Sequence, residues 1–100
     1  MSLDELRRRA SRLPRVSLTD LPTPLHECPR LSAAVGHGVR LFMKRDDLIA
    51  LGGGGNKVRK LEFSLGEALA RGCDVLVHGL AAQSNYCRQA ADAAAKVGLR

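Results

Sequence analysis

Apolar residues near the N-terminus recur at the spacing of an amphipathic helix. Leu3, Leu6, Ala10 and Leu13 fall on one side of such a helix, and arginines lie between them. This pattern predicts a surface helix whose apolar side packs on a larger body. Three prolines, each of which removes a backbone donor, then predict an irregular segment: Pro14, Pro22 and Pro24.

Prolines and glycines also delimit the elements that follow. Pro29 suits the first position of a short helix that Gly36 or Gly38 would end. Residues 39–45 (VRLFMKR) alternate with a period of two, which predicts a strand with one buried face. The four glycines at 52–55 can adopt backbone conformations that are closed to other residues, so we expect this loop to pass close to a ligand.

Two helices with a strand between them are predicted in the second half of the chain. Apolar residues recur at helical spacing after Asn56, which suits the N-cap. Residues 73–78 (CDVLVH) form a short apolar run, which is typical of a strand covered on both faces and implies a parallel sheet. Ser84 or Asn85 can cap a second, alanine-rich helix. The glycines expected to end these two helices are Gly72 and Gly98.

The order strand, helix, strand, helix is the repeat of an open α/β sheet. In such sheets, ligands bind where strand ends meet helix N-termini. Residues 52–57 and residues 79–85 both lie at junctions of this kind. The sequence therefore predicts an α/β fold with an open parallel sheet flanked by helices, and it places the candidate site at these two loops.

Length and composition fit one small soluble unit, because the chain has 100 residues, of which 45% are hydrophobic and 26% charged. No apolar run approaches the roughly 18 residues of a membrane span. Asp4 and Glu5 stand where a signal peptide would be apolar and a mitochondrial presequence free of acids. The three cysteines are odd in number and widely spaced, so we expect free thiols, a cytoplasmic location and no membrane partner.

The net charge of +6 is concentrated in the N-terminal arginines. Such a cluster can attract nucleic acid, but it also fits the solvated face of a helix. We favour the solvated face and expect no nucleic-acid partner. The arginines concerned are Arg7, Arg8, Arg9, Arg12 and Arg15.

Lys57 is the principal candidate for chemistry. A phosphate loop needs Gly before the lysine and Ser or Thr after it, whereas Asn56 and Val58 stand there. No start within the glycine run gives a dinucleotide fingerprint either. What remains is a lysine in the first turn of a helix, where the helix dipole favours the neutral amine that attacks aldehydes. Lys57 therefore suits Schiff-base chemistry with pyridoxal phosphate, and the alternative is an exposed lysine at a helix end.

Ser84 and Asn85 are the second candidates. At a helix start they offer a hydroxyl, an amide and unpaired backbone N–H groups, which together suit a carboxylate. The alternative is an ordinary N-cap.

The remaining polar candidates receive no catalytic role. None of the three histidines, His26, His37 and His78, forms a zinc spacing with the cysteines, so we assign no metal. Asp46 and Asp47 are adjacent and point apart on a strand end, and the neighbouring Lys and Arg offer simple ion pairs, so we assign them to structure.

Several separated motifs together resemble one enzyme family. LPTPLHECPRLS, KRDDL, GGNKVRKLEF and AAQSNYCRQAADAAAKVGL have the order and spacing seen in D-cysteine desulfhydrases and 1-aminocyclopropane-1-carboxylate deaminases. The resemblance covers about residues 13–100. It implies the N-terminal third of a fold type II enzyme, similar to the tryptophan synthase β subunit, with pyridoxal 5′-phosphate as cofactor.

The resemblance also implies roles for individual residues. Lys57 matches the lysine that binds the cofactor covalently, and Lys60 matches a second basic residue near it. Ser84 matches a serine near the substrate carboxylate, sometimes assigned as the nucleophile, and Asn85 matches a residue that hydrogen-bonds the hydroxyl of the cofactor ring. Tyr86 departs from the His or Gln of the family, as the GLAA turn before Gln83 departs from a more glycine-rich one.

The activity implied is that of a lyase or deaminase acting on a small amino acid. The products would be a 2-oxo acid and ammonia, with sulfide as well if the substrate is D-cysteine. Because family members are much longer, we expect residues 1–100 to be the N-terminal segment of the catalytic fold, inactive alone, and a homodimer in the full-length form. The alternative is a non-catalytic fragment that binds a small anion or a partner through the same helix ends.

Overall fold

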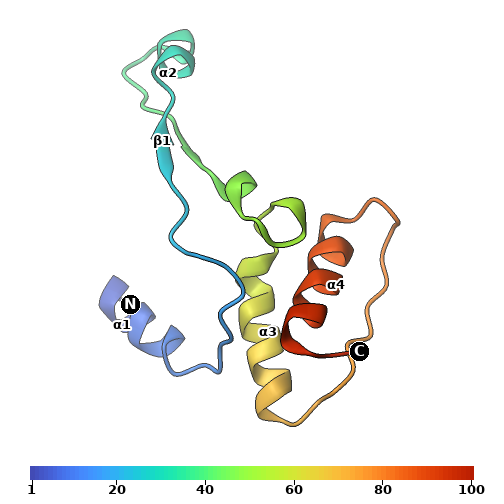
Figure 1. Cartoon of the computed structure of the whole chain (residues 1–100). Helices are drawn as coiled ribbons and strands as arrows, with labels where there is room; N and C mark the ends of the chain where they lie inside the picture. The colour runs from blue at the N-terminus through green and yellow to red at the C-terminus, as the bar shows by residue number, and fades with distance from the viewer.

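Helices dominate the chain, and two short strands form its hairpin (Figure 1). The computed structural model describes residues 1–100. Its elements are α1 (Leu3–Ala10), β1 (Leu25–Glu27), α2 (Pro29–Val35), β2 (Phe42–Lys44), the 3₁₀ turns η1 (Asp46–Leu48) and η2 (Leu51–Gly53), α3 (Val58–Ala70) and α4 (Asn85–Val97).

The body of the molecule is built from α3 and α4, with η2 crossing α4 (Figure 1). Val58, Leu61 and Leu65 lie on one side of α3 and are buried, as their helical spacing predicts. Alanines of α4 face them, which lets the two helices approach closely. The buried apolar core is Leu18, Ile49, Leu51, Val58, Leu61, Leu65, Ala90, Ala93, Ala94 and Leu99.

The ends of these two helices agree with the sequence except at one position. The hydroxyl oxygen of Ser84 caps α4, and Gly98 ends it at φ +78°. Gly72 follows the last turn of α3 with φ +74°, a conformation that favours glycine. The N-cap of α3 is Lys57 and not the predicted Asn56, and no side chain caps this end.

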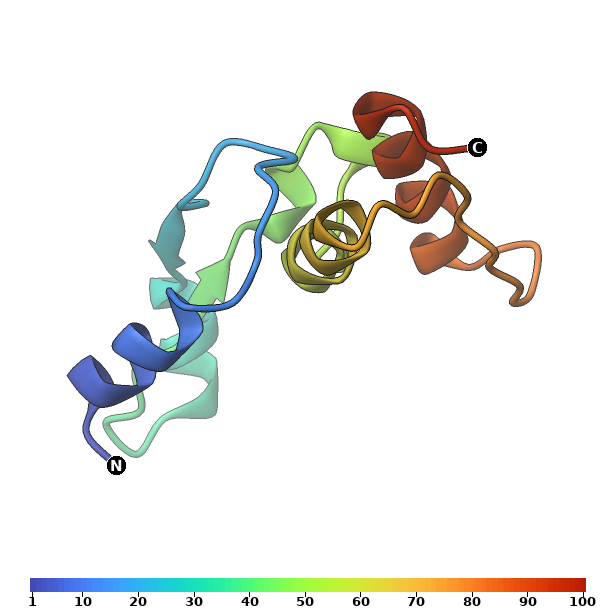
Figure 2. The ribbon, with the colours of Figure 1, turned by 90° about the horizontal axis from the view of Figure 1, so that it is seen from below.

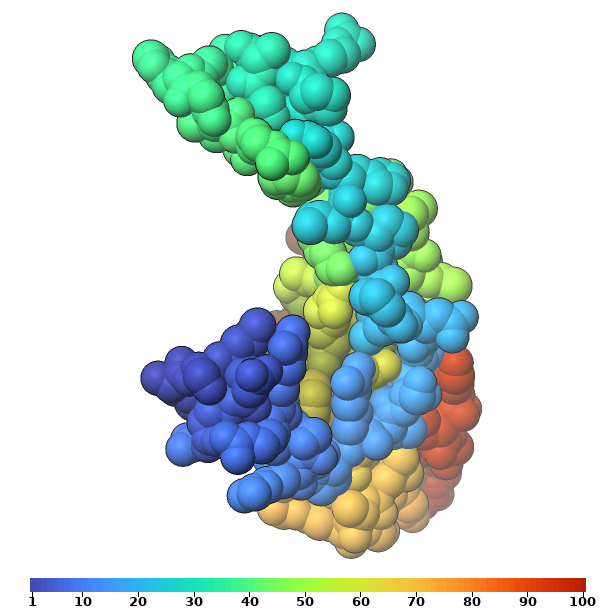
Figure 3. All heavy atoms as spheres, turned by 90° about the vertical axis from the view of Figure 1, so that its left-hand side faces the viewer, coloured from blue at the N-terminus to red at the C-terminus, as the bar shows by residue number.

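A long arm projects from the body and carries α2 at its tip (Figures 1 and 3). Its strands β1 and β2 pair antiparallel, with Leu25 opposite Lys44 and Glu27 opposite Phe42. Every strand residue is exposed, so the prediction of a buried face at 39–45 is wrong. The reason is that nothing in this chain packs on either face of the hairpin. The radius of gyration, 16.9 Å, accordingly exceeds the roughly 13 Å of a compact chain of this length.

The predicted strand 73–78 is extended chain and not part of a regular sheet. The N–H of Arg100 donates to the carbonyl of Asp74 at 2.9 Å, and the N–H of Leu76 donates to the carbonyl of Arg100 at 2.7 Å. This is the bonding pattern of a parallel pair. The expected coverage on both faces is absent, since Val77 is 90% exposed. Parallel pairing is therefore present at one point only, and the regular sheet of the chain is the antiparallel hairpin.

The N-terminal helix forms as predicted, but it does not pack as predicted. Helix α1 lies apart from α3 and α4 (Figure 2), and it buries no residue. Leu3 is 61% exposed and Leu6 is 48% exposed. The three cysteines are free thiols. None of the helices is long and apolar enough to cross a membrane.

Candidate active site

The N-terminal ends of α3 and α4 border one hollow of about 430 Å³. This volume lies in the range of roughly 300–1,000 Å³ that small-molecule sites occupy. The four candidate residues from the sequence all line it. The complete lining is Lys57, Lys60, His78, Leu80, Ser84, Asn85 and Tyr86.

A second, larger hollow of about 580 Å³ carries less chemistry. It lies between the segment before Leu21 and helix α4. Its one lysine, Lys96, donates to the carbonyl of Leu18 at 2.9 Å, and its Asp92 accepts the N–H of Gly52 at 2.6 Å. These groups hold the fold together, so the smaller hollow is the candidate site.

Lys57 stands at the junction of the glycine loop and α3. Its carbonyl accepts the N–H of Leu61 at 3.1 Å, which starts the helix. Its amine donates to the side-chain oxygen of the neighbouring Asn56 at 3.0 Å and makes no other hydrogen bond. The amine is therefore held only by a local contact, at the edge of a hollow.

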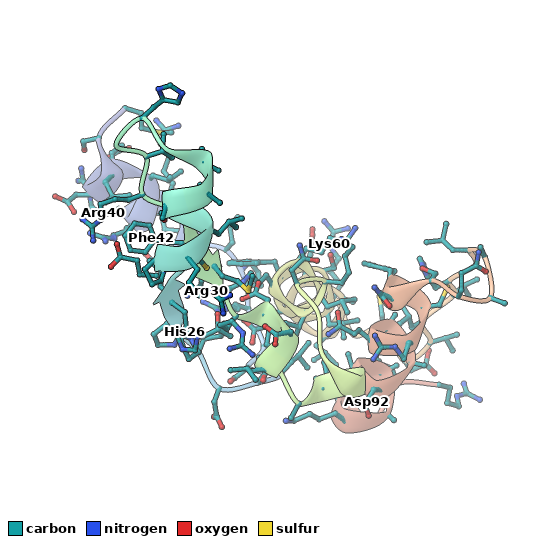
Figure 4. The ribbon with its side chains drawn as sticks, turned by 90° about the horizontal axis from the view of Figure 1, so that it is seen from above. His26, Arg30, Arg40, Phe42, Lys60 and Asp92 are labelled. Atoms are coloured by element: carbon teal, nitrogen blue, oxygen red, sulfur yellow. The ribbon has the colours of Figure 1, made fainter.

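The glycine loop approaches α4 and not the hollow. Gly52 has φ +57°, and a Cβ there would lie 2.9 Å from the Cα of Gln89. The amide of Gln89 donates to the carbonyls of Leu51 at 3.1 Å and Gly55 at 3.0 Å. Figure 4 labels Asp92 where the loop crosses the helix. None of the four glycines lines the hollow, so the contact that this loop makes within the chain is with α4, and its approach to a ligand stays a prediction.

Arg59 ties the first turn of α3 to both ends of the arm. Its Nε and Nη2 donate to the two carboxylate oxygens of Asp46, at 2.8 and 2.7 Å, just after β2. Its Nη2 also donates to the hydroxyl oxygen of Thr23, 3.0 Å away and just before β1. The carbonyl of Asp46 accepts the N–H of Gly55 at 2.9 Å. These bonds fix the turn on which Lys57 stands.

The two aspartates have the structural role expected of them, with one different partner. Asp47 pairs with Arg45 at 2.7 Å, as predicted, and this hydrogen bond lowers the pKa of Asp47. Asp46 pairs instead with Arg59, which is distant from it in sequence. The hydrogen bonds from Arg59 and then from Thr23 hold the pKa of Asp46 well below its usual range.

Ser84 and Asn85 begin α4 on the far side of the hollow from α3. The hydroxyl oxygen of Ser84 accepts the N–H of Cys87 at 3.4 Å, which is the ordinary capping contact. The side-chain oxygen of Asn85 accepts a bond from Arg88 at 3.1 Å. Both residues line the hollow, next to the positive end of a helix of 13 residues.

Tyr86 and His78 complete the wall. The amine of Lys60 lies 4.2 Å from the centre of the Tyr86 ring, and the His78 ring centre lies 4.4 Å from that of Tyr86. The place of His78 in this wall was not predicted, because the sequence offers only its position at the end of a predicted strand. Gln89 and Arg59 were missed for a different reason, since their partners lie far away along the chain.

Known proteins are similar to this chain over most of its length. A family model described as "Pyridoxal-phosphate dependent enzyme" matches residues 16–100. A D-cysteine desulfhydrase from Klebsiella pneumoniae subsp. pneumoniae is 50% identical over 99 residues, which make up 99% of this chain and 28% of that protein. A Pyrococcus abyssi protein with the provisional name 1-aminocyclopropane-1-carboxylate deaminase is 51% identical over 89 residues, 89% of this chain and 26% of that protein.

A solved structure shares the fold. The crystal structure of an ACC deaminase homologue matches with a TM-score of 0.86 and 40% identity, over 99% of this chain and 30% of that one. The chain thus spans little more than a quarter of the length of the curated relatives it matches.

Proposed function

Because this chain belongs to the family of pyridoxal-phosphate dependent enzymes, we propose that its hollow is part of the active site of a lyase or deaminase for a small amino acid. Relatives named D-cysteine desulfhydrase and 1-aminocyclopropane-1-carboxylate deaminase support this reaction class. The products would be a 2-oxo acid and ammonia, with sulfide as well from D-cysteine. The observation that carries the proposal is the meeting of Lys57, Lys60, Ser84 and Asn85 around one hollow.

The predicted fold class is confirmed by the same comparisons. The chain has the fold of the N-terminal portion of a fold type II enzyme of this family. We propose that residues 1–100 form one wall of the catalytic centre, and that the activity of the whole enzyme needs the length that its relatives have in addition.

The groups around the hollow fit pyridoxal phosphate, which combines an aldehyde, a ring hydroxyl and a phosphate. The amine of Lys57 suits the aldehyde and the amide of Asn85 suits the hydroxyl. The ammonium of Lys60 and the N-terminal ends of the helices suit an anion. When bound, the cofactor supplies an electron sink for charge that develops on the substrate.

The residues of this chain would bind and orient the cofactor and the substrate and would transfer protons. Lys57 would hold the cofactor and, once released by the substrate, carry a proton at its Nζ. Ser84 would bind the substrate carboxylate together with the free N–H groups at the start of α4, with its Oγ as an alternative nucleophile. Asn85 would orient the cofactor ring.

The partners proposed are a small amino acid and, in a longer form of the enzyme, a second copy in a cytoplasmic homodimer. We propose no nucleic-acid partner. The arginines of α1 support this view, because Arg7 pairs with Asp4 at 3.3 Å and Arg8 and Arg9 pair with Glu5 at 2.6 and 2.9 Å. Charge that is paired within the helix attracts phosphate less strongly.

A non-catalytic role in partner binding is the second candidate, and the arm favours it. Leu25, Phe42 and Met43 of the hairpin are 62%, 48% and 52% exposed. Exposed apolar side chains of this kind mark interaction surfaces. A folded chain that forms no covalent complex with the cofactor would favour this second candidate.

The test is covalent trapping of the cofactor on the full chain. The protein is incubated with pyridoxal phosphate, reduced with borohydride, and analysed by intact mass and peptide mapping. We expect one adduct at Lys57, which is lost in Lys57→Arg and retained in the matched control Lys60→Arg. Equal labelling of Lys44 and Lys96, or an undiminished adduct in Lys57→Arg, would overturn the assignment.

A further inference from the structure

The hollow contains two lysines that are one helical turn apart but differ in their surroundings. Lys57 contacts only the side-chain oxygen of Asn56 through its amine. The amine of Lys60 instead lies over the face of Tyr86, 4.2 Å from the ring centre. Lys60 lies in the first turns of α3, which Figure 4 views from the N-terminal end.

The ring of Tyr86 has a second neighbour, the imidazole ring of His78. The ring of His78 lies 4.4 Å from it, centre to centre, at an interplanar angle of 52°. Tyr86 comes from α4 and His78 from the extended segment before it, so three separate parts of the chain meet at the ring of Tyr86: Lys60, Tyr86 and His78.

An aromatic face discriminates between the two forms of an amine. Its negative quadrupole attracts an ammonium ion and has no comparable attraction for a neutral amine. Attack on a carbonyl needs the neutral amine with a free lone pair. A lysine over a ring is therefore favoured as a cation and disfavoured as a nucleophile.

We propose that Tyr86 is a positioning residue that divides the two lysines by role. It holds Lys60 as a fixed cation on the wall of the hollow and leaves Lys57 as the amine that reacts with a carbonyl. This inference rests on the proposed function and explains how a hollow with two adjacent lysines would direct an aldehyde to one of them. The charge of Lys60 is then available to an anionic group of the same ligand.

The test uses a small aldehyde, so that it does not depend on cofactor binding. The chain is labelled at trace level with isotopic formaldehyde and cyanoborohydride, and peptide mapping gives the ratio of labelling at Lys60 to labelling at Lys57. We expect less labelling at Lys60 than at Lys57 in the unmodified chain. Tyr86→Leu should raise the ratio about two- to five-fold, the range for a cation–π contact at an exposed site. Tyr86→Phe keeps the ring and should leave the ratio unchanged.

A second measurement covers the case in which Tyr86→Leu does not fold. In the unmodified chain, the ring should shift the NMR signal of the Lys60 ε-methylene upfield of the Lys57 signal. Equal shifts for the two lysines, or a ratio that Tyr86→Leu leaves unchanged in a folded chain, would overturn the inference. If the ratio behaves as expected but pyridoxal phosphate forms no adduct at Lys57, the proposed function fails and the role of Tyr86 stands.

Discussion

Arg59 binds the carboxylate of Asp46 through two parallel hydrogen bonds, 2.8 Å from Nε to Oδ2 and 2.7 Å from Nη2 to Oδ1. Two-pronged contacts of this kind are stronger and more directional than single ones. Since Arg59 follows Lys57 by two residues, the pair sets the stability of the turn from which the candidate site is built.

Asp46→Asn should therefore destabilise the chain in a pH-dependent way. The pKa of Asp46 is lowered from 3.8 on folding, first by Arg59 and then by Thr23, so its stabilisation is complete above about pH 4 and declines as the pH falls further. At pH 7 we expect a loss of about 1 to 3 kcal/mol in the free energy of unfolding, toward the low end because Arg59 is 39% exposed. Urea unfolding at a series of pH values measures it.

The matched control for Asp46→Asn is Asp74→Asn. Asp74 pairs with Arg100 at 3.1 Å, but both side chains are about four-fifths exposed, so its loss should change stability by less than about 1 kcal/mol. A loss in Asp46→Asn that is the same at pH 2.5 as at pH 7 would contradict the prediction.

The buried ion pair of Glu62 and Arg15 should respond unequally to loss of its two members. The Glu62 side chain is 1% exposed and also accepts the N–H of Leu18 at 3.0 Å, whereas Arg15 is 48% exposed. Arg15→Met strands a buried carboxylate and should lower the free energy of unfolding by about 3 kcal/mol. Glu62→Gln keeps the bond to Leu18 and leaves an arginine that water can solvate, so about 1 kcal/mol is expected. Chemical denaturation compares them, and a larger loss in Glu62→Gln would refute the argument.

Gly66→Ala should destabilise α3, although alanine is the better helix former by about 1 kcal/mol. A Cβ at Gly66 would lie 2.6 Å from the Cα of Arg15, where the N-terminal segment crosses the helix. Backbone on both sides must then move, at a cost of about 1 to 3 kcal/mol. Ser64→Ala, at an exposed position of the same helix, is the control and should fall within about 0.5 kcal/mol of the unmodified chain. Thermal unfolding of both variants measures the difference. A Gly66→Ala variant that is more stable than the unmodified chain would show that the N-terminal segment does not pack closely on α3 at Gly66.

Gln89 should tolerate an apolar substitution better than an acidic one. Its amide is fully buried and donates to two carbonyls, those of Leu51 and Gly55. Gln89→Leu leaves the carbonyl of Gly55 unpaired and leaves the carbonyl of Leu51 with only the N–H of Gly54, so it should lower the free energy of unfolding by about 1 to 3 kcal/mol. Gln89→Glu sets a carboxylate against the same carbonyls and should be less stable still at pH 7.

Acidification gives a further check on the two Gln89 variants. Burial raises the pKa of a carboxyl group, and the protonated form can donate to one of the carbonyls. Gln89→Glu should therefore recover stability relative to Gln89→Leu as the pH is lowered from 7 to 4 in urea unfolding. A carboxylate variant that equals or exceeds the leucine variant at pH 7 would indicate that the loop packs less tightly on α4 than described.

The helices and all but one of the ends of α3 and α4 were predictable because their signals are local. Ser84 and Gly98 bound α4 as expected, and the apolar spacing of α3 identified its buried face. The candidate site followed from the same signals, since it lies where two helices begin. Local patterns carry this information because caps and helical faces depend on residues only a few positions apart.

What the sequence missed depends on contacts between distant segments. Glu62 received no role from the sequence, yet its carboxylate is buried and binds both Arg15 and the N–H of Leu18. The strand pattern at 39–45 predicted a buried face that no other part of this chain covers. The contact of the glycine run with α4 was not predicted for the same reason, because that helix begins some thirty positions later.

The two ends of the hairpin arm converge on a single guanidinium. Thr23, which precedes β1, and Asp46, which follows β2, are both bonded to Arg59. Arg59 is therefore a single point at which both ends of the arm are attached to α3. A movement of the exposed tip would reach the rest of the chain through these bonds, and the first residues that it would meet are those of the turn that carries Lys57.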